Sequence, residues 1–139
     1  MAPIRDELIA AFEQVLDSGH YILGPEVRAF EDEFARYLDV PFATGMSNGT
    51  CSLHIAFRCL DLEPGAEIIT APNSFIASAS TIALAGATPV FVDVDDDLNI
   101  DVAQIEAAIT PRTRAIVPVH LAARPARMPE IMAIAEQHG

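Results

Sequence analysis

Hydrophobic residues recur at helical spacing in two stripes at the start of the chain. The first stripe consists of Ile4, Leu8, Phe12, Val15 and Leu16, and the second of Val27, Phe30, Phe34, Tyr37 and Leu38. Gly19 follows the first stripe as a typical helix end, and Pro25 opens the second at a first helical position. The pattern therefore predicts two amphipathic helices that precede any strand.

Beyond residue 41, short apolar runs alternate with longer amphipathic stretches. The runs predict strands over 42–46, 67–70, 90–94 and 115–119, and the stretches predict helices over 50–60, 75–85, 102–109 and 128–138. Strands about two dozen residues apart with a helix between them are typical of parallel βαβ crossovers. The sequence therefore predicts an α/β fold.

Side chains that can cap helices stand where several of these helices should begin. Asp101 and Gln104 form a capping-box pattern. Either Asn73 or Ser74 can cap the helix that follows them. Gly139 stands where a helix end would lead into another strand, so we expect the fold to continue beyond it.

Charge and composition narrow the class of protein. Of the 139 residues 51% are hydrophobic, and 20 acidic against 8 basic residues give a net charge of −12. Such a charge disfavours nucleic acid and anionic membrane surfaces as partners. The sequence has no apolar run of roughly eighteen residues, and its start is an acidic amphipathic helix unlike a signal peptide. We therefore expect a cytoplasmic protein with no membrane partner.

All 8 basic residues are arginines, so the chain contains no lysine. It therefore has no side-chain amine on which a Schiff base can form, and it lacks the lysine of a Walker-type phosphate loop. Its 2 cysteines, Cys51 and Cys59, stand on one predicted helix, roughly 12 Å apart at the helical rise. That distance is too long for a disulfide, so both are expected to be reduced and structural.

The segment 42–57 is the most informative one for chemistry, because a short apolar strand leads through small polar residues into an amphipathic helix. The first N–H groups of a helix have no internal partner and lie at the positive end of its dipole, which favours a bound phosphate. Gly49 allows close backbone approach, and Thr50 adds a hydroxyl donor. The alternative is a plain N-cap made by Ser47, Asn48 or Thr50.

Several short motifs follow one another along the chain. They are 18–26 (SGHYILGPE), 47–50 (SNGT), 64–65 (PG), 67–70 (EIIT), 73–78 (NSFIAS), 85–89 (AGATP), 92–95 (VDVD), 109–114 (ITPRTR) and 118–121 (PVHL). In this order and spacing they resemble the DegT/DnrJ/EryC1/StrS family of pyridoxal-phosphate-dependent sugar aminotransferases. The resemblance covers essentially the whole chain, and these are fold-type I enzymes, similar in fold to aspartate aminotransferase.

The resemblance implies a three-layer αβα fold with a mostly parallel sheet, the amino-terminal part of the large domain that binds pyridoxal phosphate. Residues 1–40 would form a helical arm, and residues 41–139 an incomplete large domain. In the family, the aspartate that pairs with the pyridine nitrogen and the Schiff-base lysine come later in the sequence. Both would therefore lie outside these residues.

The resemblance also assigns site residues. Asn48, Gly49 and Thr50 would hold the cofactor phosphate, and Phe75 would stack on the pyridine ring, with ordinary core packing as the alternative for Phe75. Tyr21 would lie near the sugar substrate or the facing subunit, with a loop anchor as its alternative. No catalytic residue and no metal site are expected in the chain.

Two further groups of titratable residues are interpreted as structural. His120 follows the last predicted strand, near the place of the family's cofactor pocket, and a structural histidine is the favoured interpretation. The acidic turn at 93–97 is interpreted as solvated carboxylates that follow a strand, not as a Mg²⁺ site.

The segment after His120 departs from the family pattern. The family usually continues with Tyr-Gly-Gln-Pro-Ala-Asp, whereas residues 122–127 read Ala-Ala-Arg-Pro-Ala-Arg. If the family's glycine needs a positive φ, Ala123 adopts that conformation only at a cost, so we expect an altered loop. Cys51 and Ser52 replace a common Asp-Ala pair, which is a milder change.

The function implied by the resemblance is transfer of an amino group from a donor such as glutamate to a nucleotide-diphosphate keto-(deoxy)sugar. The enzyme would be a cytoplasmic homodimer with pyridoxal 5'-phosphate as cofactor, and the 139-residue chain alone is predicted to be inactive. Two alternatives stay open: a truncated or degenerate homologue with a binding or structural role, and a Rossmann-like nucleotide-binding module. Against the second, no G-x-G-x-x-G follows a predicted strand.

Overall fold

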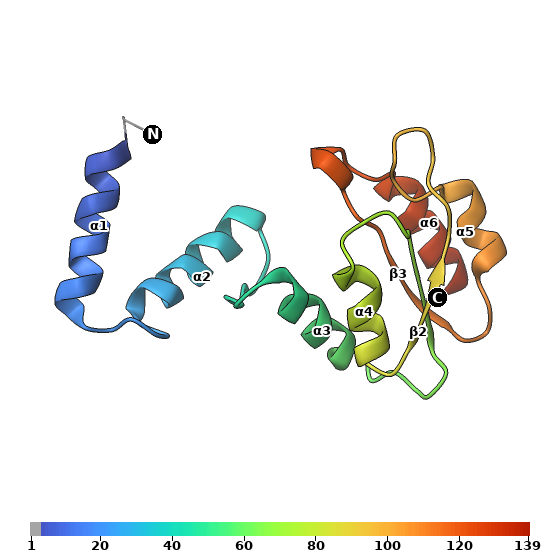
Figure 1. Cartoon of the computed structure of the whole chain (residues 1–139), viewed down its shortest axis with the longest axis horizontal. Coiled ribbons are helices and arrows are strands. Elements are labelled where there is room, and N and C mark those ends of the chain that lie inside the picture. The colour runs from blue at the N-terminus through green and yellow to red at the C-terminus, as the bar shows by residue number, and fades with distance from the viewer. Residues whose placement is uncertain (1–3) are drawn as a thin grey trace. The chain divides into compact units, whose positions relative to one another are not determined.

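The computed structural model describes residues 4–139. It divides the chain into two units, the first ending at Met46 and the second running from Ser47 to Gly139. In chain order the elements are α1 (Arg5–Ser18), α2 (Pro25–Leu38), α3 (Gly49–Cys59), β1 (Glu67–Thr70), α4 (Ala77–Leu84), β2 (Thr88–Phe91), α5 (Val102–Ala108), β3 (Thr113–Val117), the 3-10 helix η2 (Leu121–Ala123) and α6 (Met128–His138) (Figure 1).

The first unit confirms both helices predicted from the hydrophobic stripes. α1 ends at Gly19, whose φ of 67° lets its N–H donate to the carbonyl of Leu16 at 3.2 Å. α2 begins with proline at its amino end. Along α2 the rings of Phe30 and Phe34 stack with their centroids 5.5 Å apart. Both rings stay exposed, as does Phe12 of α1, so the stripes form no closed core among the described residues.

The second unit is built on a parallel sheet of three strands in the order β2-β1-β3. β1 is the central strand, and Thr70 at its end lies opposite Phe91 of β2 and Val117 of β3. The register to β3 shifts between Glu67 and Ile68, which marks an irregularity in the ladder. The parallel βαβ crossovers predicted from the spacing of the apolar runs are confirmed.

Helices cover both faces of this sheet. The neighbouring residues Ile68 and Ile69 of β1 are fully buried and belong to two different core clusters, as alternation along a strand requires. Ile68 packs with the cluster that contains Phe57 of α3 and Ile82 of α4. The cluster of Ile69 contains Ile105 of α5 and Ile131 of α6. The unit therefore has three layers, α3 and α4, the sheet, and α5 and α6 (Figure 1).

The placement of the helices follows from the handedness of the crossovers. The connection from β1 through α4 leads outward to β2, and the connection from β2 through α5 leads back across β1 to β3. Right-handed crossovers that run in opposite directions put their helices on opposite faces of the sheet.

One of the four predicted strands, 42–46, is wrong. This segment pairs with no strand among the described residues, and Phe42 is 85% exposed.

Helix starts agree with the sequence at α5 and differ at α4. Asp101 accepts a hydrogen bond from the N–H of Ala103 at 3.0 Å and another from the side chain of Gln104 at 2.6 Å, which confirms the predicted cap. At α4 the N-cap is Ile76, with no side-chain cap. Asn73 instead donates to the carbonyl of Leu98 at 2.9 Å, so a tertiary partner replaces the predicted local one.

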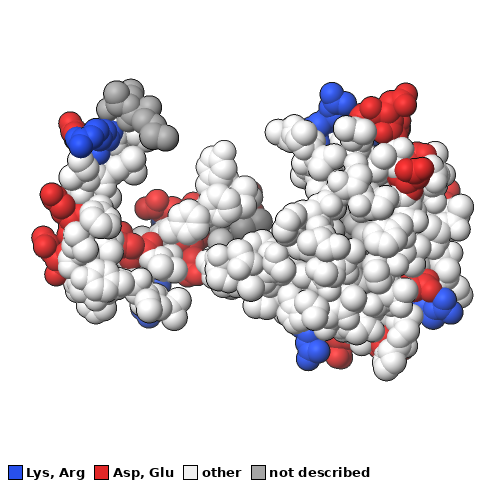
Figure 2. Space-filling view, viewed as in Figure 1, with Lys and Arg blue, Asp and Glu red and all other residues white. Residues whose placement is uncertain are grey.

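Charged side chains are spread over the surface. On the face shown in Figure 2, acidic side chains are distributed along the first unit. The basic side chains of the second unit are isolated from one another, and several lie beside acidic ones. No helix in the part of the chain that the structure describes is long and apolar enough to cross a membrane.

Candidate functional site

The carboxyl edge of the sheet is where the topology places a ligand crevice. The helix that follows β1 is α4, on one face, and the helix that follows β3 is α6, on the other. Ligands of open α/β sheets bind at such a switch point, outside the carboxyl ends of the two strands. α3 leads from its carboxyl end into the start of β1, so its amino end, with Gly49 and Thr50, points toward this same edge.

The start of α3 combines a cap with free donors. Asn48 is the N-cap, and its Oδ1 accepts a hydrogen bond from the N–H of Cys51 at 2.9 Å. Its carbonyl accepts from the N–H of Ser52 at 3.1 Å. Asn48 is therefore a helix N-cap, and the backbone N–H groups of Gly49 and Thr50 have no hydrogen-bond partner among residues 4–139.

This arrangement fits a bound phosphate. A side chain added at Gly49 would meet no atom within 4 Å, so a ligand can approach the backbone there. Thr50 is exposed, and the first turn of α3 contains no acidic residue that would repel an anion. Two free N–H groups, a hydroxyl and the positive end of the helix dipole together form an anion cradle, which we define as residues 48–51.

Phe75 lies in the connection from β1 to α4, and its side chain is 74% exposed. Among the described residues, Phe75 is therefore not packed into the core. Its carbonyl accepts a hydrogen bond from the N–H of Ser78 at 3.0 Å, which holds the backbone while the ring stays uncovered. An uncovered aromatic face at the carboxyl edge can stack on a flat heteroaromatic ring.

Tyr21 lies in the first unit, in the connection between α1 and α2. Its hydroxyl donates to the carbonyl of Leu16 at 3.2 Å, which is the contact expected of a loop anchor. The side chain is 66% exposed, so most of the ring is free to contact another molecule. A substrate contact by Tyr21 stays a prediction.

His120 and Asn99 organise the loop after β3. Nδ1 of His120 accepts a hydrogen bond from the N–H of Ala126 at 3.0 Å, as a structural histidine would. Asn99 is 2% exposed, and its Oδ1 accepts from the N–H of Leu121 at 3.1 Å. Sequence reasoning missed Asn99, because a single asparagine after an acidic turn gives no signal of partners more than twenty residues away.

Ala123 adopts the positive φ that was considered for it from the sequence. Ala122 has a φ of 51° and Ala123 a φ of 63°, so two successive alanines adopt the left-handed conformation. Each carries a Cβ that disfavours this region, which glycine enters freely. The loop is thus formed, with strain, without the glycine that the family usually has there.

The carboxylates of the acidic turn are engaged locally. Asp93 accepts from the N–H of Val94 at 2.8 Å, and Asp97 accepts from the N–H of Asn99 at 2.9 Å. Asp95 forms an ion pair with Arg127, at the start of α6. Within residues 4–139 no group of three His, Cys, Asp or Glu side chains is arranged to hold a metal ion.

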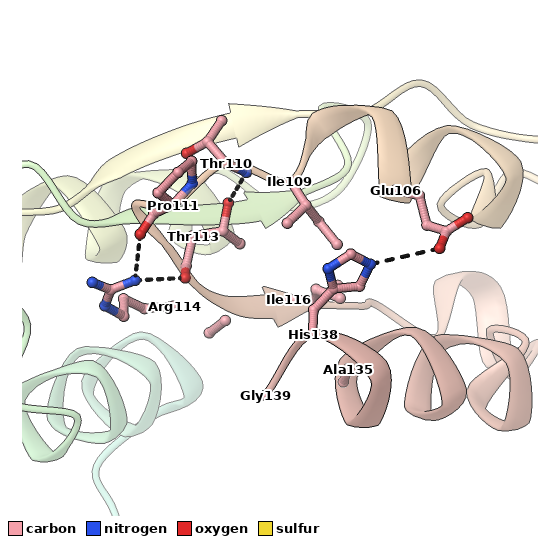
Figure 3. A pocket seen from close by; sticks show the side chains of 11 residues that line it. Glu106, Ile109, Thr110, Pro111, Thr113, Arg114, Ile116, Ala135, His138 and Gly139 are labelled. Carbon is pink, nitrogen blue, oxygen red and sulfur yellow. Dashed lines mark hydrogen bonds and ion pairs between the residues drawn. The ribbon is translucent and has the colours of Figure 1, made fainter.

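A separate pocket lies along the edge of β3 that carries no neighbouring strand among the described residues (Figure 3). Its walls include Ile109, Ile116 and Ala135, and at one end His138 contacts the carboxylate of Glu106 at 3.6 Å. None of the predicted site residues lines this pocket.

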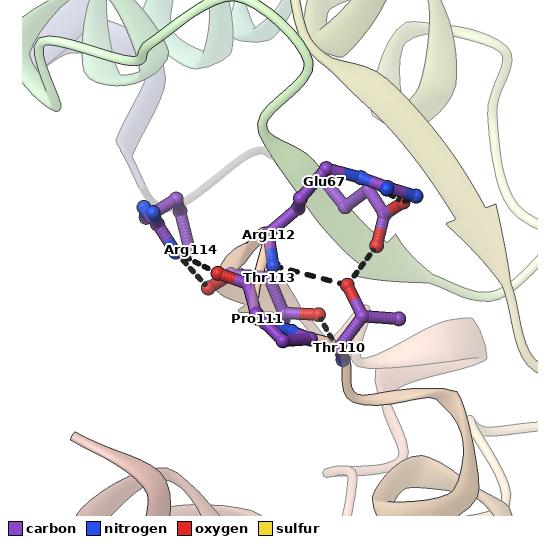
Figure 4. Close-up of polar contacts among 6 residues, drawn as sticks. All are labelled: Glu67, Thr110, Pro111, Arg112, Thr113 and Arg114. Atoms are coloured by element: carbon purple, nitrogen blue, oxygen red, sulfur yellow. Dashed lines mark hydrogen bonds and ion pairs between the residues drawn. The ribbon is translucent and has the colours of Figure 1, made fainter.

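A polar network around Glu67 lies at the opposite, amino edge of the sheet (Figure 4). Glu67, at the start of β1, accepts from the hydroxyl of Thr110 at 2.6 Å and from Nε of Arg112 at 2.9 Å. The hydrogen bond from Thr110, followed by that from Arg112, lowers the pKa of Glu67 below its ordinary value of 4.5. The network ties the loop before β3 to β1 and lies far along the strands from the anion cradle.

Comparison with known proteins places these features in a family context. The sequence model of the DegT/DnrJ/EryC1/StrS aminotransferase family matches residues 3–139. UDP-N-acetyl-3-dehydro-alpha-D-glucosamine 3-aminotransferase of Acidithiobacillus ferrooxidans is 49% identical over 139 residues, which cover 99% of this chain and 38% of that protein.

Solved structures give the same result for the fold. DesV of S. venezuelae, solved in complex with a ketimine intermediate, has a TM-score of 0.92 and 44% identity, covering 99% of this chain and 38% of that one. NtdA of Bacillus subtilis, solved with bound cofactor PMP, has a TM-score of 0.90 and 34% identity, covering 96% of this chain and 31% of that one. The predicted αβα fold is confirmed, and this chain spans between 31% and 38% of the length of these two proteins.

Proposed function

Because the chain belongs to the DegT/DnrJ/EryC1/StrS aminotransferase family, we propose that a full-length protein containing it transfers an amino group to a nucleotide-linked keto-sugar. The amino donor would be an amino acid such as glutamate, and the cofactor pyridoxal 5'-phosphate. A relative named for a UDP-linked dehydro-glucosamine supports the substrate class. A solved neighbour with bound PMP supports the cofactor.

The observation that carries the proposal is the anion cradle. Gly49 and Thr50 present free N–H groups at the amino end of α3, while Asn48 caps the third N–H and so fixes their direction. We assign the phosphate of the cofactor to these groups and to the hydroxyl of Thr50. An anion held there gains hydrogen bonds to charged oxygens and the field of the helix together.

Phe75 supplies the second contact in this proposal. Its exposed ring lies in the loop after β1, at the edge toward which α3 also points its amino end. A ring stacked on the pyridine would hold the cofactor flat and keep water from one of its faces. We further propose that residues 1–40 act as a helical arm of a homodimeric, cytoplasmic enzyme, with Tyr21 near the substrate or the facing subunit, and that residues 41–139 form part of the cofactor domain.

When bound, pyridoxal phosphate supplies the electron sink of transamination. The residues of this chain bind and orient it, because the sequence provides no lysine that could exchange a proton or an amine with it. We therefore assign the amine chemistry to parts of a full-length protein outside these residues. The 139-residue chain alone is expected to be inactive.

The experiment that tests the cradle is the dissociation constant of pyridoxal phosphate from the full-length protein and its Thr50→Val variant. Loss of one hydroxyl bond to a charged phosphate is expected to weaken binding by about 1.5–3 kcal/mol, roughly ten- to a hundredfold. Thr50→Ser is the matched control, because it keeps the hydroxyl and should bind the cofactor nearly as the parent does.

The activity itself is tested by mass spectrometry of the sugar product after incubation with glutamate and a nucleotide-linked keto-sugar. An amino-sugar product that requires the cofactor supports the proposal. A full-length protein that binds no pyridoxal phosphate contradicts it and favours a homologue with a binding or structural role. A Thr50→Val variant that binds the cofactor as tightly as the parent contradicts the assignment of the Thr50 hydroxyl to the phosphate and leaves Thr50 a plain capping role.

A further inference from the structure

The turn at 95–99 braces two loops at the carboxyl edge of the sheet. On one side the carbonyl of Leu98 accepts from the side chain of Asn73 at 2.9 Å, two residues before Phe75. On the other side Asn99 reaches the loop after β3, which we call the His120 loop and define as residues 120–126. The turn therefore stands between the segment that carries Phe75 and the segment that carries His120.

Asn99 holds the His120 loop near both of its ends. Its Oδ1 accepts from the N–H of Leu121 at 3.1 Å, and its Nδ2 donates to the carbonyls of Arg124 at 3.4 Å and Pro125 at 3.5 Å. The side chain is 2% exposed, so water cannot replace these partners without opening the turn. A buried amide with every group engaged fixes the geometry of the backbone around it.

The loop that Asn99 holds is a strained one. Ala122 and Ala123 both have positive φ, a conformation that persists only where surrounding contacts determine it. Within the same loop, Nδ1 of His120 accepts from the N–H of Ala126. Because Nδ1 acts as the acceptor, the neutral imidazole carries its proton on Nε2, which is then a hydrogen-bond donor at the ligand edge.

We propose that Asn99 is a positioning residue that holds the His120 loop in its strained form and thereby fixes the imidazole of His120 as an Nε2–H donor beside the cofactor site. The part of this inference that concerns the cofactor rests on the proposed function. The part that concerns Asn99, the loop and the imidazole rests on the contacts alone. The ion pair between Asp95 and Arg127 joins the same turn to the residue that follows the loop, and so gives the turn a further contact beside the loop.

The test compares the full-length protein, labelled with ¹⁵N-histidine, with its Asn99→Ala variant at an alkaline pH where imidazole is neutral. In the parent, the His120 signals, assigned by their loss in His120→Gln, should show Nδ1 as acceptor and Nε2 protonated. In Asn99→Ala they should move toward an average of the two neutral forms. Unchanged His120 signals in Asn99→Ala overturn the proposal.

A second variant keeps the test decisive if Asn99→Ala does not fold. Asn99→Asp is of the same size and keeps the acceptor for Leu121, but it replaces the donor to Arg124 and Pro125 with a carboxylate oxygen that repels their carbonyls. It should shift the His120 signals in the same direction as Asn99→Ala does. Glu67→Gln is the matched control, because it removes a buried charge at the opposite edge of the sheet, and it should leave the His120 signals where they are. If Glu67→Gln shifts the His120 signals as much as Asn99→Ala does, the shifts reflect a general loss of stability and the proposal is overturned.

Pyridoxal phosphate binding separates this inference from the proposed function. In a parent that binds the cofactor, Asn99→Ala should raise its dissociation constant about tenfold, while Glu67→Gln leaves it unchanged. An unchanged constant in Asn99→Ala overturns the link to the cofactor. If the parent binds no cofactor, the proposed function fails, and the histidine spectra alone decide whether Asn99 positions His120.

Discussion

Nε of Arg112 donates to the carboxylate of Glu67 at 2.9 Å, across the amino edge of the sheet. The same carboxylate accepts from Thr110, so one loop satisfies both oxygens of Glu67. The hydrogen bond from Thr110, with that from Arg112, holds the pKa of Glu67 below 4.5. A carboxyl group with a lowered pKa in the folded state binds its proton less readily there than in the unfolded chain.

The first prediction concerns pH. Glu67 stabilises the fold fully above its ordinary pKa of 4.5, and this contribution is lost as the pH falls through the lowered value. We expect Glu67→Gln to be less stable than the parent at neutral pH, with the difference closing in acid below 4.5. Urea unfolding of both full-length proteins between neutral and acidic pH measures it. A difference that is constant with pH would contradict the assigned pKa.

Thr110→Val provides a graded version of this test. It removes the hydrogen bond that contributes most to the lowered pKa of Glu67 and keeps the contact of the Arg112 guanidinium with Glu67, but it also removes the acceptor for the N–H of Arg112 at 3.1 Å. Its stability should therefore fall between those of the parent and Glu67→Gln at neutral pH. If Thr110→Val is less stable than Glu67→Gln, the hydrogen bond from the N–H of Arg112 to the same hydroxyl contributes more to stability than the contact with Glu67.

The second prediction concerns the left-handed alanines of the His120 loop. Ala122→Gly and Ala123→Gly should each stabilise the protein by about 1 kcal/mol, because glycine adopts positive φ without the clash of a Cβ. The gain is partly offset by the greater backbone freedom of glycine in the unfolded chain. Thermal unfolding of the full-length variants measures it.

Ala107→Gly is the matched control for these two substitutions. Ala107 lies exposed inside α5, where glycine should destabilise by about 1 kcal/mol. The change from alanine to glycine is thus expected to raise stability in the His120 loop and to lower it in α5. If all three variants lose stability alike, the positive φ values of the loop do not store strain.

The third prediction concerns the absence of lysine. With its α-amino group blocked, the 139-residue chain should show no covalent pyridoxyl adduct after incubation with pyridoxal phosphate and reduction with borohydride, because it has no ε-amine. Intact mass spectrometry after gel filtration decides the outcome. An adduct on an internal residue would contradict the prediction and reveal another nucleophile.

The sequence predicted the helices and the central strand more closely than the outer strands. The predicted strand 67–70 and the predicted helix 128–138 coincide with β1 and α6. The outer strands were expected at 90–94 and 115–119, but both begin two residues earlier and also end earlier. Their bounds are set by the residues that pair with β1. Val92 and Val94 are apolar because they contribute to the core, beyond the end of the ladder.

The site was predicted in part for a similar reason. Local chemistry, such as the cap made by Asn48, can be predicted from adjacent residues because its partner lies within one helical turn. Asn73 forms a hydrogen bond with a carbonyl 25 residues away, and Asn99 forms hydrogen bonds with partners 22 to 26 residues away. No local sequence pattern predicts such contacts. The exposure of Phe75 likewise depends on packing that residues 73–78 alone do not specify.

The division of the chain at Met46 and Ser47 makes the anion cradle modular. Its cap, its two free N–H groups and its hydroxyl all belong to residues that follow this boundary, and the cap bonds only within α3. A protease cut or an inserted linker just before Ser47 would therefore leave every donor of the cradle attached to the sheet. Residues 47–139 thus contain the whole anion cradle without the two amino-terminal helices.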